Sequence, residues 1–126
     1  MSVTQITVQS PSNETIYSNT AIGNTASAVK ASSTLALYAV VDNTANVAAT
    51  YVKFYNVASG SVTVGTTSPD QVLFCPASVI STFQLQTGAT AGQTFGTALT
   101  VAAVTTGGTA GAVSPSSNVP LLIAYV

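Results

Sequence analysis

The chain has 126 residues, of which 47% are hydrophobic and only 4% charged, with no His and a formal net charge of −1. This length is enough for one domain with a hydrophobic core, and the hydrophobic content excludes a disordered chain. So few charges provide no basic patch for nucleic-acid phosphates. The apolar runs are far shorter than the ~18 residues that cross a bilayer, so no membrane partner is expected.

Residues 1–33 are expected to form a loop-rich N-terminal arm, ahead of a sandwich core at residues 34–126 in a single β domain over 1–126. Within the arm, Ile6 and Val8 form one narrow apolar edge between polar neighbours. This pattern is typical of a strand that is added to a sheet edge or to another subunit. Ile6 and Val8 are therefore candidate assembly contacts.

Three further segments follow in the first half of the chain. Residues 26–32 are the one possible helix, although they are short and poorly capped. Residues 35–41 are apolar on both faces and rich in strand formers, which predicts a central strand covered on both sides. Residues 49–57 alternate with a period of two, which predicts a half-buried strand.

The outer face of the strand at 49–57 carries Tyr51, Lys53 and Tyr55. Tyrosine supplies a large rigid contact area with a polar tip, so these three residues are candidate contacts with another subunit or with a sugar. The alternative is that a neighbouring loop of the same chain packs over them.

The second half of the chain continues the strand pattern, with glycines and prolines between the apolar segments. Further strands are predicted at residues 71–75, 79–85, 97–105 and 121–126. The last of these is apolar on both faces, which indicates an interior strand. The low-complexity stretches at 88–96 and 105–117 are expected to be hairpin loops. The prediction is an all-β fold, an antiparallel β-sandwich or small β-barrel of about seven or eight short strands.

The sequence offers little for catalysis. Glu14, Asp42 and Asp70 lie in separate turn-like contexts, where a carboxylate usually bonds its own backbone. Cys75 lies in an apolar strand and reads as a small buried hydrophobe, because activation of a thiol needs a nearby base or cation. No catalytic site, metal or cofactor is expected, and the chain is not expected to be an enzyme.

The order of strands and turns resembles that of small β-sandwich virion proteins of tailed bacteriophages. The segments that carry this resemblance are residues 52–56, 64–65, 68–74, 95–98 and the final strand. The resemblance implies a capsid decoration or cement subunit, or a minor head or tail component. It further implies that the partners are the major capsid protein and copies of the chain itself.

Together these observations favour a non-enzymatic decoration protein that stabilises a capsid lattice. The chain start lacks a secretory signal, while its Lys-poor, Thr- and Ser-rich composition is typical of extracellular surfaces. A virion protein made in the host cytoplasm fits both, as a homo-oligomer that binds neither nucleic acid nor membrane. Two alternatives remain: a carbohydrate- or receptor-binding module of a tail or head fibre, and a subunit of a strand-exchanged extracellular filament.

Overall fold

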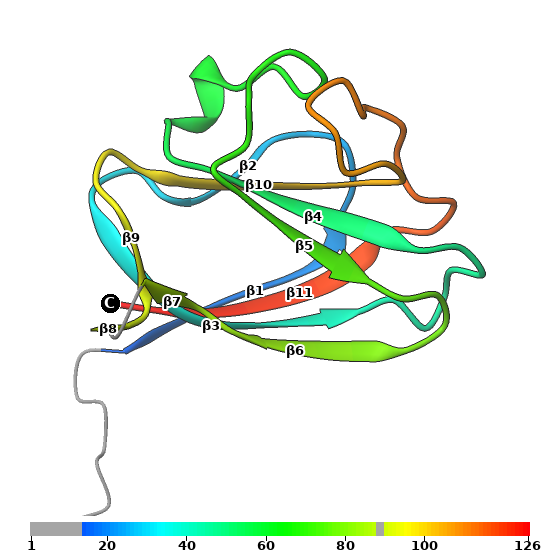
Figure 1. Cartoon of the computed structure of the whole chain (residues 1–126), viewed down its shortest axis with the longest axis horizontal. Helices are drawn as coiled ribbons and strands as arrows, with labels where there is room; N and C mark the ends of the chain where they lie inside the picture. The colour runs from blue at the N-terminus through cyan, green and yellow to red at the C-terminus, as the bar shows by residue number, and fades with distance from the viewer. Residues whose placement is uncertain (1–13, 88–89) are drawn as a thin grey trace, which may run out of the picture.

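Two antiparallel sheets packed face to face make up most of the molecule (Figure 1). The computed structural model describes residues 14–87 and 90–126. One sheet has five strands and the other four, and a two-stranded ribbon lies beside them. The sheets stay separate across the described residues, which confirms the predicted all-β sandwich and excludes the barrel form.

The larger sheet runs in the order β1-β11-β3-β6, with β9 also paired to β3. Its strands are β1 (Thr15–Ile22), β11 (Val119–Tyr125), β3 (Thr34–Asp42), β6 (Ile80–Gln84) and β9 (Gln93–Phe95). The smaller sheet runs β2-β10-β4-β5. Its strands are β2 (Ser27–Lys30), β10 (Leu99–Val104), β4 (Thr50–Tyr55) and β5 (Gln71–Cys75). The ribbon is β7 (Gln86–Thr87) with β8 (Thr90–Ala91), and one 3-10 turn, η1, covers Ser59–Ser61.

The core lies between the two sheets and follows the period of two that the sequence displays. Val52 and Phe54 of β4 face it from the smaller sheet, and Leu121 and Ile123 of β11 face it from the larger one. The ring of Phe54 lies 5.9 Å from that of Phe95, in a tilted arrangement that aromatic pairs favour. The predicted interior position of the last strand is confirmed, since β11 pairs with both β1 and β3.

The two inner strands of the smaller sheet, β10 and β4, are largely buried on both faces. Thr100, Ala102 and Val104 of β10 point away from the core, yet each is fully buried. Figure 1 shows why, because segments 56–70 and 105–118 run across the outer side of this sheet. The hydroxyl of Thr100 fixes the first of these segments by donating to the carbonyl of Val57 at 2.7 Å.

A buried polar cluster ties the turns at one end of the sandwich together. The side-chain amide of Asn43 donates to the carbonyls of Ala48 and Pro76, and its oxygen accepts from Thr50. Asn46 donates to the same oxygen and exchanges two hydrogen bonds with Ser117. Because these buried amides are bonded to three turns, they hold the 105–118 segment in place.

The N-terminal region differs from the prediction. Of the expected loop-rich arm, the described residues contain two strands, β1 paired to β11 and β2 paired to β10. The one possible helix, at 26–32, does not form, because strand β2 occupies most of this segment. Long-range pairing with the apolar strands β10 and β11 outweighs the weak local preferences of these Ser-, Thr- and Asn-rich residues. The segment with Ile6 and Val8, which has the pattern of an added edge strand, lies outside the described residues.

Two other predictions need correction. The 105–117 stretch is not a hairpin loop, since it connects β10 of one sheet to β11 of the other. Strand β3 is not covered on both sides, because Tyr38 and Val40 on its outer side remain partly exposed. The sequence displays apolar faces on β3 and β10 alike, and only the path of the loops decides which face is covered.

Candidate functional site

Lys53, expected on an outward contact face, is fully buried. Its ammonium reaches out of β4 into the loop that covers the sheet. There it donates to the carbonyl oxygens of Gly108 at 2.6 Å, Gly111 at 2.8 Å and Thr109 at 3.4 Å. Burial lowers the pKa of this amine. Lys53 does lie on the outer side of β4, but a loop of its own chain covers it and supplies the partners of its charge.

The two tyrosines of the same face are also engaged within the chain. Tyr55 is fully buried, and burial raises the pKa of its phenol. Tyr51 is half-buried, with its ring 5.3 Å from that of Phe74 and packed against Gly107. The alternative considered for this face, packing by a neighbouring loop, describes Lys53 and Tyr51 correctly. The other two candidates, Ile6 and Val8, lie outside the described residues.

The carboxylate of Asp42 bonds its own turn, as the sequence predicts, whereas that of Asp70 bonds a backbone amide at the other end of the 56–70 segment. Asp42 accepts hydrogen bonds from the backbone amide and the hydroxyl of Thr44, and these bonds lower its pKa. Asp70 accepts from the backbone amide of Asn56 at 2.7 Å. Each carboxylate therefore stabilises a local turn or loop.

Cys75 is a free, fully buried cysteine on β5. Burial raises the pKa of its thiol to about 12, so the nucleophilic thiolate is not formed at neutral pH. This confirms the interpretation of Cys75 as a buried hydrophobe. Across the part of the chain that the structure describes, no three His, Cys, Asp or Glu side chains gather in a group that could hold a metal ion.

The most distinctive surface of the molecule is the outer side of the larger sheet, here called the open face. It consists of the outward side chains of β1, β11, β3 and β6. The cross-strand pairing arranges eight of them in two rows. One row is Ile16, Ala124, Tyr38 and Gln84, and the other is Ser18, Leu122, Val40 and Thr82. In Figure 1 no described segment crosses this side of the sheet.

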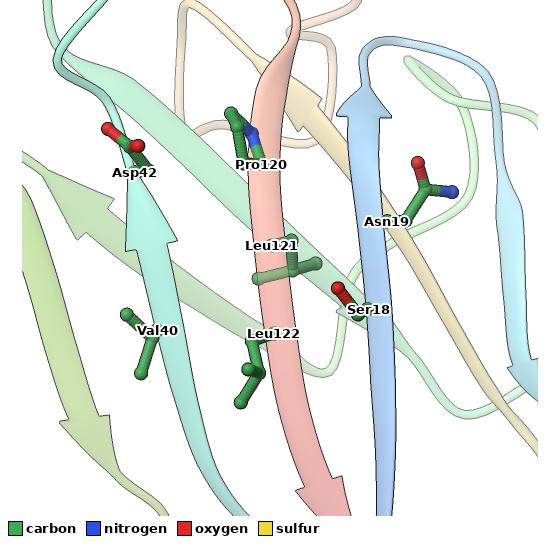
Figure 2. Close-up of a pocket in the computed structure, with 7 residues that line it drawn as sticks. All are labelled: Ser18, Asn19, Val40, Asp42, Pro120, Leu121 and Leu122. Carbon is green, nitrogen blue, oxygen red and sulfur yellow. The ribbon is translucent and has the colours of Figure 1, made fainter.

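The centre of the open face is apolar and hollowed. Figure 2 shows Leu122 of β11 beside Val40 of β3, with Ser18 of β1 on its other flank. Together with Pro120 and Asp42 these side chains line a shallow hollow of about 200 Å³. At the far edge, Ile80 of β6 projects into solvent with 60% of its surface exposed.

The open face carries almost no charge. Neither row of four contains an ionisable group except the phenol of Tyr38, and Asp42 lies at one end of the face. The Asp42 carboxylate is engaged by Thr44 of the adjoining turn. Uncharged hydroxyl, amide and aliphatic groups lose little solvation energy when a partner covers them, whereas each buried ion costs several kcal/mol or so. The chemistry of this face suits contact with another neutral protein surface.

Sequence reasoning missed the open face. Residues 35–41 and 121–126 are apolar on both faces, but this pattern predicts cover on both sides for the first and only an interior position for the second, so it does not reveal a face open to solvent. The outer face of one sheet is covered and that of the other is open because segments 56–70 and 105–118 run only over the smaller sheet. Their placement depends on contacts between residues distant in the sequence, such as the hydrogen bond between Lys53 and Gly108.

Comparison with protein-family models, with curated proteins and with solved structures found no match for this chain. Within the described ranges, no helix is long and apolar enough to cross a membrane.

Proposed function

We propose that this protein is a non-enzymatic structural subunit of a virus particle, a capsid decoration protein that stabilises the major capsid lattice of a tailed phage. The observation that supports a structural role is the open face, which has an apolar centre and almost no charge, and which no loop within residues 14–87 and 90–126 covers. The phage setting comes from the resemblance of strand and turn order described for residues 52–74 and 95–98.

The mechanism follows from the surface chemistry. Many copies, each contributing a modest neutral contact, add up to a large stabilisation when the contact repeats over a symmetric lattice. The contacts need no charge complementarity, so their strength depends little on ionic strength. A decoration protein of this kind acts by holding neighbouring capsid subunits together against the pressure of packaged DNA.

The test uses purified protein and capsids of the encoding phage that lack it. The protein should sediment with the capsids, and the bound amount should change little between low and high salt. Decorated capsids should retain their DNA at temperatures at which bare capsids release it. Failure to sediment with capsids at any salt concentration, or a measurable turnover of a substrate, contradicts the proposal.

A second candidate function, a carbohydrate-binding module, is favoured by one observation. Phe74 is 51% exposed and its ring lies beside that of Tyr51, so an aromatic surface is accessible next to the 105–118 segment. Sugars stack on such rings. Binding of glycans that disappears in Phe74→Ala, with the fold intact by circular dichroism, would support this function in place of the first.

A further inference from the structure

The open face and the near absence of net charge indicate which partner binds this surface. We propose that the open face binds the same face of a second copy of this chain, so that two larger sheets stack into a symmetric dimer. This inference rests on the proposed structural role and names the partner of its contact surface.

Charge is the first argument for a second copy. With a net charge of −1 over 126 residues, two copies repel each other very weakly, and low net charge promotes association. The open face has no cluster of one sign that would select a charged partner. A surface whose only charged side chain among the described residues is Asp42 at one end presents little charge of either sign to a second copy of itself, which suits a two-fold symmetric contact.

Shape is the second argument. The hollow over Leu122 and Val40 and the projecting side chain of Ile80 lie on the same face, as do the half-exposed Ile16 and the hydroxyl of Ser18. In a two-fold contact, a projection on one copy can fill the hollow of the other when both lie on the same surface. Sheets also stack face to face about 10 Å apart in the core of any sandwich, so the contact repeats the packing that this chain already uses internally.

The area that two copies can bury is the third argument, and it indicates how tightly the dimer is held. Four strands spaced about 4.8 Å apart, over about six residues of about 3.3 Å each, give a face of roughly 400 Å² in projection. Two opposed copies bury about twice this, and more once side-chain relief is counted, which approaches the ~1,000 Å² that a specific interface needs. The dimer is therefore weak in dilute solution and is reinforced where an assembly concentrates the copies.

The experiment is a dilution series of the full-length chain, followed by sedimentation velocity and by amide chemical shifts in NMR. The wild type should pass from dimer to monomer on dilution. The amides whose shifts move should belong to β11, β3, β1 and β6, whereas those of the 105–118 segment should stay in place.

Matched variants locate the contact. Ile16→Lys and Ile80→Lys place a charge on exposed side chains of the open face, so the fold should survive, and their combination should weaken dimerisation at least tenfold. Val113→Lys adds the same charge to a side chain that is 66% exposed on the segment covering the opposite sheet, and it should dimerise like the wild type. Circular dichroism and thermal melting verify that all variants fold.

Three results overturn the inference: a wild type that stays monomeric up to about 1 mM, a double variant that still dimerises, or shifts that move mainly in the 105–118 segment. Binding of a monomeric chain to capsids would overturn the dimer while leaving the proposed structural role intact. A dimer with no affinity for capsids would support the dimer and overturn the proposed structural role, so the two failures are distinguishable.

Discussion

The ammonium of Lys53 donates a hydrogen bond to the carbonyl oxygen of Gly108 at 2.6 Å, which ties strand β4 to the loop covering its own sheet. Two further carbonyls, of Gly111 and Thr109, complete the set. A cation thus fastens a covering loop through backbone carbonyls. The covering loop in turn is what makes the two outer faces of the sandwich different, one closed and one open.

Replacement of Lys53 by methionine tests this fastening. Lys53→Met keeps most of the aliphatic stem but leaves the carbonyls without their donor, so the free energy of unfolding should fall by about 1–3 kcal/mol. Urea denaturation measures the loss. Hydrogen exchange should rise first in residues 105–113, and an unchanged exchange rate there would show that the ammonium does not hold the loop.

Tyr55 provides a contrasting substitution two residues along the same strand. Its hydroxyl is buried and has no hydrogen-bond partner. Because Tyr55→Phe removes a polar group that is desolvated without compensation, the free energy of unfolding should stay within about 0.5 kcal/mol of the wild type or increase. The same urea titration checks this, and a loss above ~1 kcal/mol would mean that the hydroxyl is bonded in solution.

Two glycines of the covering loop make a matched pair. A Cβ atom at Gly111 would lie 2.2 Å from the backbone oxygen of Thr106, whereas a Cβ at Gly108 meets nothing within 4 Å. Gly111→Ala should therefore lower the free energy of unfolding by about 1–3 kcal/mol, because backbone must shift to relieve the overlap. Gly108→Ala should change it by less than about 0.5 kcal/mol. Thermal melting of both variants measures the two changes in stability. Equal losses of stability would contradict the close approach of Gly111 to Thr106.

Alkaline pH should destabilise the fold through Cys75. The thiol has a pKa of about 12 in the folded chain against an ordinary value of 9.0. Between these values the unfolded chain releases the thiol proton and the folded chain retains it, so stability falls as pH rises, by up to ~1.4 kcal/mol per pH unit. Burial also raises the pKa of Tyr55, which likewise makes stability fall as pH rises. It lowers the pKa of Lys53, which makes stability rise with pH.

Because several groups titrate in this range, the measured quantity is the difference between wild type and Cys75→Ala. Below pH 9.0, the ordinary thiol pKa, the two stability curves should run parallel, offset by the cavity that alanine leaves. Above it, the wild type should lose stability faster. Parallel curves at alkaline pH would contradict the raised pKa of the buried thiol.

The sequence by itself determined the fold class and most strands. The period of two in residues 49–57 and the apolar runs at 71–75 and 121–126 are local signals, and the structure has β4, β5 and β11 at these places. The turn role of Asp42 was also readable, since a short carboxylate bonds the backbone of its own turn, whereas Asp70 accepts from Asn56, a partner distant in the sequence.

Only the tertiary structure decided which faces are covered. Tyr51, Lys53 and Tyr55 alternate like an exposed face, yet the loop that fastens to Lys53 comes from more than fifty residues along the chain. Conversely, Val40 and Leu122 belong to segments apolar on both sides, yet no described loop crosses their side of the larger sheet. Alternation along a strand shows which side chains share a face, because it follows from the pleat. What lies against that face depends on distant parts of the chain, and local sequence carries no record of where those parts fold.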